Sequence, residues 1–100
     1  MSKVKMRIVG YFIDHITEEL DGAMEYAEMY LSNKKNNISW SKMYSEMATA
    51  ELTHAKYLIN MGDEYISNLS WVPEEDDEAW TKCVAKAYEK IAFIQLMLSK

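Results

Sequence analysis

The chain has 100 residues, of which 49% are hydrophobic and 27% charged, and no apolar run approaches the ~20 residues that a membrane span requires. Its formal net charge is −5, from 11 basic and 16 acidic residues, and only Lys34 and Lys35 are basic neighbours in a row. Phosphate binding needs clustered Lys and Arg, so we expect no nucleic-acid partner, and because no apolar run could span a bilayer we expect no membrane partner. These values predict one globular domain over residues 1–100.

The lone Cys83 cannot form an intrachain disulfide, which agrees with a reducing compartment. Asp14 and His15 interrupt the basic, partly apolar N-terminus and no small-residue cleavage site follows, so we expect no signal peptide and a cytoplasmic location. No histidine lies near Cys83 in the sequence and no Ser-centred or Gly-rich motif is present, which disfavours a nucleophilic enzyme.

Helix-forming residues dominate, and one Pro and three Gly leave few strand or turn signals, so the fold class expected is all-α with three long helices. The first helix is predicted over about 5–31, and 32–37 ("SNKKNN") is the loop that turns the chain back. The buried stripe of this helix is expected to contain residues at spacings of three and four: Ile8, Phe12, His15, Ile16, Glu19, Ala23, Tyr26, Ala27 and Tyr30.

The second helix is predicted to begin at Ser39 as N-cap and to continue through Gly62 to about 69. Its apolar residues recur with helical spacing, which predicts one buried stripe: Trp40, Met43, Met47, Glu51, His54, Leu58, Met61, Tyr65 and Leu69. We expect the large residues Trp40, Met43 and Met47, like Trp80 of the third helix, to pack in the core.

The third helix is predicted over about 74–98, with a stripe of Trp80, Val84, Ala87, Ile91, Ile94 and Leu98. The acidic run "PEEDDE" is typical of a helix start, because Pro is followed by acidic residues in the first turn. We favour this interpretation over a docking site for a basic partner. Helices of this length leave apolar flanks exposed in a three-helix monomer, so we expect dimerisation to complete the bundle.

Titratable residues lie on the two stripes expected to face each other. Glu51 and His54 are three residues apart and share a face of the second helix, while His15, Glu19 and Tyr26 align on the first. Glutamate and imidazole are good ligands for iron, manganese or zinc. Two interpretations stay open: a metal site, or a metal-free core in which Tyr26 donates a hydrogen bond to Glu51 and His54 is neutral.

Two segments of the chain, "EELDGAMEYAEMYL" (18–31) and "MYSEMATAELTHAKYL" (43–58), resemble the first half of the ferritin-like superfamily, in its rubrerythrin branch. That family carries a glutamate with a tyrosine seven residues later, matched here by Glu19 and Tyr26. It then carries Glu-x-x-His, matched by Glu51 and His54. The resemblance covers about residues 12–60 and implies a carboxylate-bridged di-metal site, usually iron, with Glu19, Glu51 and His54 as ligands and Tyr26 hydrogen-bonded beside them.

The third predicted helix departs from that family, because it supplies neither a second ligand glutamate nor a second Glu-x-x-His. The chain is similar in this respect to encapsulated ferritins, which complete the site between two subunits, and to short ferritin-like proteins of phages and prophages. A twofold dimer is therefore the expected assembly. His15 is expected either as an extra ligand or, preferably, as a partly exposed partner of Glu19.

Two functions follow as hypotheses. The first is a ferritin-like metal protein that oxidises or stores iron, or reduces peroxide, at a site between subunits. The second is a metal-free acidic helical module that binds a protein partner, such as a phage-encoded inhibitor of a host protein.

Overall fold

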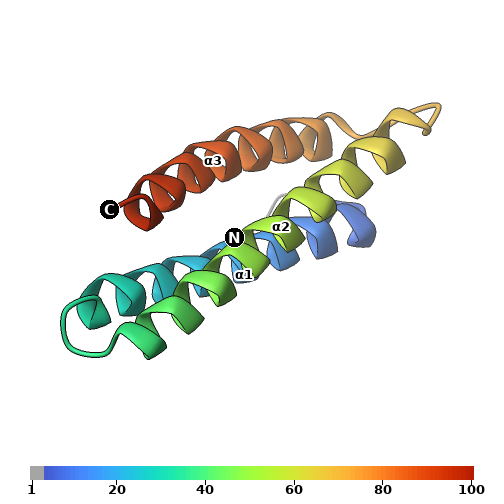
Figure 1. Ribbon diagram of the computed structural model, residues 1–100. Coiled ribbons are helices and arrows are strands. Elements are labelled where there is room, and N and C mark those ends of the chain that lie inside the picture. The colour runs from blue at the N-terminus through green and yellow to red at the C-terminus, as the bar shows by residue number, and fades with distance from the viewer. Residues whose placement is uncertain (1–3) are drawn as a thin grey trace.

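The computed structural model describes residues 4–100, and in these it contains three helices and no strand. The helices are α1 (Arg7–Asn33), α2 (Ile38–Ser67) and α3 (Glu74–Leu98). Figure 1 shows α1 and α2 as an antiparallel hairpin, with α3 returning along the hairpin. The all-α class and the three long helices are confirmed. None of the three helices has an apolar stretch long enough to cross a bilayer.

The predicted helix ends are correct to within about two residues, and the cap of the second helix is corrected. Asn37, not Ser39, is the N-cap of α2, because its side-chain oxygen accepts a hydrogen bond from the Trp40 amide at 3.0 Å. Gly62 lies inside α2, as predicted.

Small residues form the seam between α1 and α2. Ala23 and Ala27 of α1 and Ala48 and Ala55 of α2 are all completely buried. Side chains of this size let two helix backbones approach closely, which brings many atoms of both helices into contact. The buried residues of α2 are Ser41, Ala48, Leu52, Ala55, Ile59 and Gly62.

The stripe predicted to be buried on α2 is therefore wrong. Trp40 is 54% exposed, Met43 49% and Met47 42%, and Met61 and Tyr65 are exposed as well. The prediction followed the Trp and Met residues of α2. The face that packs against the rest of the molecule instead combines small residues with Leu52 and Ile59, and the Trp and Met side chains lie outside. The stripes predicted for α1 and α3 are confirmed in their main members, including the buried Trp80.

Gly62 makes room for the indole of Trp80 where α3 meets α2. A Cβ built at Gly62 would lie 2.2 Å from the Trp80 ring, so only glycine permits this contact. The Trp80 ring nitrogen donates a 2.7 Å hydrogen bond to the Asp63 carboxylate, which satisfies the polar atom of a buried aromatic side chain.

Asp76 connects the first turn of α3 to the start of α1. Its carboxylate is completely buried and accepts hydrogen bonds from the amides of Lys5 and Met6, both at 2.8 Å. These amides precede α1 and have no helical partner, and a negative charge at a helix N-terminus is favourable. The acidic run is thus a helix start, as predicted, and one of its members also caps a second helix.

We expect Asp76→Ala to lower the free energy of unfolding by about 2 kcal/mol, because two backbone donors lose a charged acceptor. Urea denaturation followed by circular dichroism measures this. Asp77→Ala is the matched control, since Asp77 is the exposed neighbour in the same run. Equal stability of the two variants would contradict this role for Asp76.

Candidate metal centre

The structure brings Glu19 of α1 together with Glu51 and His54 of α2. The Nδ1 atom of His54 lies 3.3 Å from Glu51 Oε1 and 3.5 Å from Glu19 Oε2. One ligand atom from each residue can be chosen so that all three lie within 4.8 Å of one another. Two donors that each lie about 2.1 Å from one ion are at most about 4.2 Å apart, so a small side-chain movement would suffice to bind a metal.

Gly22 provides the space that the Glu51 carboxylate occupies. It lies one turn after Glu19 on α1, and a Cβ built there would lie 2.8 Å from Glu51 Oε2. The missing side chain lets Glu51 lie against the backbone of α1 beside Glu19. The sequence pattern does not predict this role of Gly22, and the one signal for it is its position three residues after a candidate ligand.

The cluster lies at the solvent edge of the α1–α2 seam. The Glu19 side chain is 17% exposed and that of Glu51 26%, whereas the His54 side chain is 52% exposed. The prediction that neither Glu51 nor His54 faces solvent is therefore wrong for His54. The cause is the rotation of α2 that buries its small residues: it leaves the Glu51–His54 edge at the rim of the seam.

Both histidines of the chain lie beside Glu19. The Nε2 atom of His15 is 3.6 Å from Glu19 Oε1, while His54 faces the other carboxylate oxygen. At this distance His15 and Glu19 attract each other if the imidazole is protonated, but the geometry is too long for a hydrogen bond. The edge-to-face contact of the His15 ring with Tyr11, at 5.4 Å between centroids, holds the imidazole beside Glu19. His15 thus occupies the position of a partner to Glu19, one side chain away from Glu51.

The two carboxylates are held close together at an electrostatic cost. Burial is the main cause that raises the pKa of Glu51 above its ordinary value of 4.5, and the adjacent Glu19 raises it further, while His54 opposes the shift. Within residues 4–100, two buried side-chain polar atoms have no hydrogen-bond partner: Glu19 Oε2 in this group, and Nδ1 of the neighbouring His15. A cation between the carboxylates would relieve their repulsion and give Glu19 Oε2 a partner.

Tyr26 does not form the hydrogen bond predicted for it. Its ring stacks on Tyr44 of α2, with centroids 6.2 Å apart, and no hydrogen bond joins its hydroxyl to Glu51. Tyr26 remains on the same face of α1, two turns beyond Glu19. It is placed near the seam and outside the cluster of candidate ligands.

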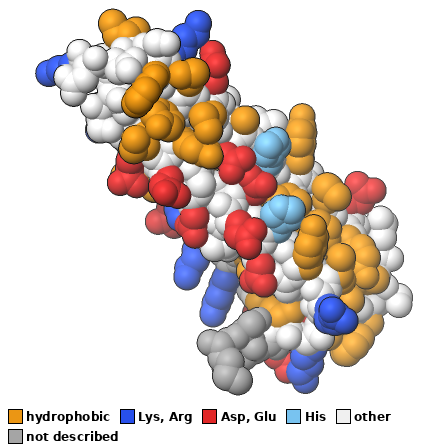
Figure 2. Space-filling view, turned by 90° about the horizontal axis from the view of Figure 1, so that it is seen from below, with side chains coloured by type: hydrophobic (Ala, Val, Ile, Leu, Met, Phe, Trp, Pro, Cys, Tyr) orange, Lys and Arg blue, Asp and Glu red, His pale blue; other side chains and the backbone are white. Residues whose placement is uncertain are grey.

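Hydrophobic side chains flank the cluster on the surface. Figure 2 shows the two histidines and neighbouring acids near the middle of one face, with hydrophobic side chains toward both ends of the molecule. Along α2 the exposed apolar residues Trp40, Met43 and Met47 precede Glu51, and Met61 and Tyr65 follow His54. Exposed apolar side chains grouped in this way are typical of an interaction surface.

A scan against protein-family models found no match for the chain, and searches of curated proteins and of solved structures found none either. The ferritin-like resemblance therefore rests on the two motifs and stays a prediction. The geometry of Glu19, Glu51 and His54 stands independently of it.

We expect Glu51→Gln to stabilise the metal-free protein, and this gain to increase with pH. The unfolded carboxyl titrates near 4.5 and the folded one higher, so the folded state holds a proton that the unfolded state has released. The stability of the natural protein relative to Glu51→Gln therefore falls as the pH rises from about 4.5 through the raised pKa of the folded state.

Urea unfolding at several pH values between 4 and 8, with a chelator present, measures this difference. Glu46→Gln, an exposed glutamate on the same helix, should show no such pH-dependent gain. A difference between Glu51→Gln and the natural protein that is constant across this range would contradict the electrostatic cost assigned to the carboxylate pair.

Proposed function

We propose that this chain is a metal-binding protein whose ligands are Glu19, Glu51 and His54. The observation that carries the proposal is the pair of partly buried carboxylates that converge with an imidazole, with Glu19 Oε2 lacking a hydrogen-bond donor. A divalent cation balances two carboxylates and one neutral histidine without residual charge. The space above Gly22 lets Glu51 reach the position that binding requires.

Iron is the proposed metal, with manganese and zinc as competitors for the same donors. Oxygen and imidazole donors suit all three ions, and anionic oxygen ligands stabilise the higher charge state of iron. The activity proposed is the oxidation of Fe(II), with iron as substrate and oxygen or peroxide as oxidant. In this activity Glu19 and Glu51 hold the ion and His54 completes the ligand set from the solvent side.

We further propose that two copies of the chain complete the site. One chain offers three protein donors, and a twofold arrangement brings four carboxylates and two imidazoles together, enough for two ions. The apolar residues on both sides of the cluster form a self-complementary surface for such a dimer, with the histidines near its centre.

The shape of a single chain supports this assembly. Its radius of gyration is 15.6 Å, against about 13 Å for a compact domain of this length. Its accessible surface is 6805 Å², against about 5,900 Å² for a compact monomer of this size. The excess is of the order that one partner buries in a standard interface, about 800 Å².

A second function has its own support in the same surface. The exposed apolar face of α2 also fits the alternative of a metal-free module that binds another protein. In that case Glu51 and His54 lie in the arrangement of metal ligands but bind no metal. A metal-free, fully stable monomer that binds one stoichiometric protein partner through this face would favour the alternative.

Anaerobic titration with Fe(II), followed by air, tests the proposed function. We expect saturation at one iron per chain, a near-ultraviolet absorbance that develops with oxygen, and at least about tenfold weaker binding by His54→Ala. Competition by Zn(II) provides a readout that does not depend on oxidation. No metal-dependent absorbance and no Zn(II) binding would reject the proposal, as would unchanged binding by His54→Ala.

Gly22→Ala separates metal binding from folding. The new methyl group displaces only the end of the Glu51 side chain, so the helix keeps its structure and gains up to about 1 kcal/mol of helix propensity while metal binding weakens. Gly10→Ala is the matched control on α1, because its Cβ would meet only Val4, at 3.8 Å. Both variants should be at least as stable as the natural chain, and only Gly22→Ala should bind metal weakly.

We expect Met47→Asp to convert the metal-loaded dimer to a monomer and to weaken metal binding at least about tenfold, because a charge in an apolar interface is costly. Light scattering after size exclusion measures the mass. Phe93→Asp is the control, since Phe93 is 55% exposed but lies on α3. If the metal-loaded natural protein is monomeric, the proposal of a site shared between two chains is rejected. The proposal that Glu19, Glu51 and His54 bind the metal does not depend on this result.

A further inference from the structure

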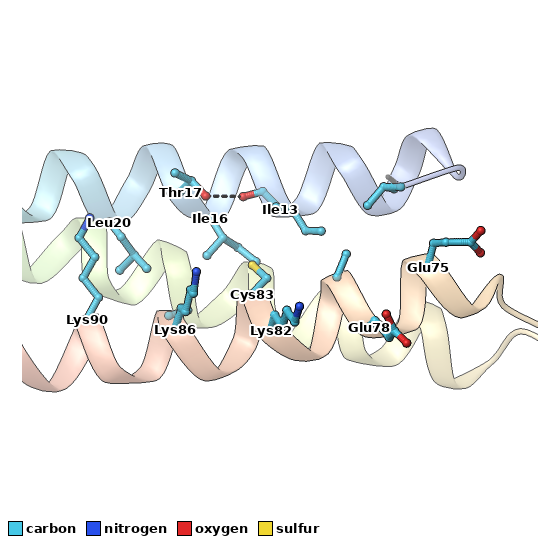
Figure 3. Close-up of a pocket in the computed structure, with 13 residues that line it drawn as sticks. Ile13, Ile16, Thr17, Leu20, Glu75, Glu78, Lys82, Cys83, Lys86 and Lys90 are labelled. Atoms are coloured by element: carbon cyan, nitrogen blue, oxygen red, sulfur yellow. Dashed lines mark hydrogen bonds between the residues drawn. The ribbon is translucent and has the colours of Figure 1, made fainter. Parts of the chain in front are cut away.

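A groove runs between α1 and α3, away from the candidate metal centre. Its volume is about 610 Å³, within the range of small-molecule sites. Figure 3 shows Ile13, Ile16 and Leu20 extending from α1 toward α3 over this groove. On the α3 side its floor is apolar and lined by small side chains, Ala79, Cys83 and Ala87.

Ion pairs between the two sides of the groove lie at both of its ends. At one end Lys90 of α3 reaches Asp21 of α1 at 2.7 Å. At the other end Glu75 of α3 reaches Lys5, just before α1, at 3.2 Å. Glu75 and Lys90 are fifteen residues apart, which corresponds to about 22 Å along a helix. The apolar floor between these pairs therefore has a defined length.

Two lysines on the rim between these ends have no ion-pair partner. Lys82 and Lys86 lie one helical turn apart on α3, and neither forms an ion pair with any residue in the described part of the chain, although acidic residues outnumber basic ones. Glu75 and Glu78 precede these lysines along α3, so the lining is acidic at the Glu75 end and basic from the middle of the groove onward. This polarity favours an occupant with one anionic end.

We propose that the α1–α3 groove binds a long-chain carboxylate. Its two head-group oxygens would contact the ammonium groups of Lys82 and Lys86, and its alkyl chain would cover the apolar floor around Cys83. A partner helix with acidic side chains has complementary charge as well, but the ion pairs at both ends limit the length of the occupant and favour a single small amphiphile. The proposal is independent of metal binding, because the groove contains none of the three candidate ligands.

Cys83 provides a direct reporter of occupancy. It is the only cysteine of the chain, it lines the groove, and it is partly exposed when the groove is empty. Burial raises the pKa of its thiol, so alkylation is best measured near pH 8.5, where part of the thiol is ionised. An alkyl chain on the groove floor would shield the sulfur from a small alkylating reagent.

The experiment measures the rate of Cys83 alkylation by iodoacetamide with increasing tetradecanoate, below its micelle concentration. We expect at least about tenfold protection at saturation, one tetradecanoate per chain by calorimetry, and at least about tenfold weaker binding of octanoate because it buries fewer methylene groups. The double variant Lys82→Gln/Lys86→Gln should bind tetradecanoate about tenfold more weakly, and Lys35→Gln/Lys42→Gln, the same charge change at exposed positions elsewhere, should bind it normally.

Several outcomes would overturn the proposal. These are the absence of protection by tetradecanoate, equal protection by tetradecyltrimethylammonium, and unchanged binding by Lys82→Gln/Lys86→Gln. Protection accompanied by loss of the circular dichroism signal would show detergent unfolding and would count against the site. Binding to vesicles of anionic lipid without binding of the free carboxylate would assign the lysines to a membrane surface instead.

Discussion

The close approach of α1 and α2 is the constraint on which the rest of the molecule depends. Alanines on both sides of the seam and Gly22 on α1 bring the backbones together, and Glu51 lies over Gly22 beside Glu19 as a result. A wider seam would let the two carboxylates separate into solvent and lose their mutual repulsion. The same packing turns the large apolar residues of α2 outward, so the candidate ligands and the apolar surface around them have one common cause.

The arrangement of helices could be predicted from the sequence, but the rotation of α2 could not be predicted from hydrophobicity. On α1 and α3 the predicted stripes are confirmed in their main members, because Phe12 and Ile16 of α1 and Trp80, Ile91 and Ile94 of α3 are buried. On α2 a second stripe competes, in which small residues recur every seven positions: Ser41, Ala48, Ala55 and Gly62. Burial of small residues releases little apolar surface from water, yet it permits the closest contact between helices, and this second effect determines the seam.

The candidate ligands could be predicted because each motif is local and helix geometry places its members on one face. The features that depend on distant parts of the chain were not predictable in this way. The acceptor for the amides of Lys5 and Met6 lies about seventy residues away in Asp76. The space at Gly22 depends on which residue of α2 lies opposite. In both cases the relevant quantity is the relative rotation of two helices, which no local pattern contains.

The missing second motif of α3 has a physical explanation within the proposed function. α3 packs mainly on α1, caps the start of α1 through Asp76, and forms one side of the lysine-lined groove, so it does not approach the α1–α2 edge where the ligands lie. Ligands on α3 could not reach Glu19 and His54 from that position. In the proposed function, further donors for a second ion would come from another molecule, and the apolar residues that flank His54 on the open face are the surface proposed for contact with a second copy.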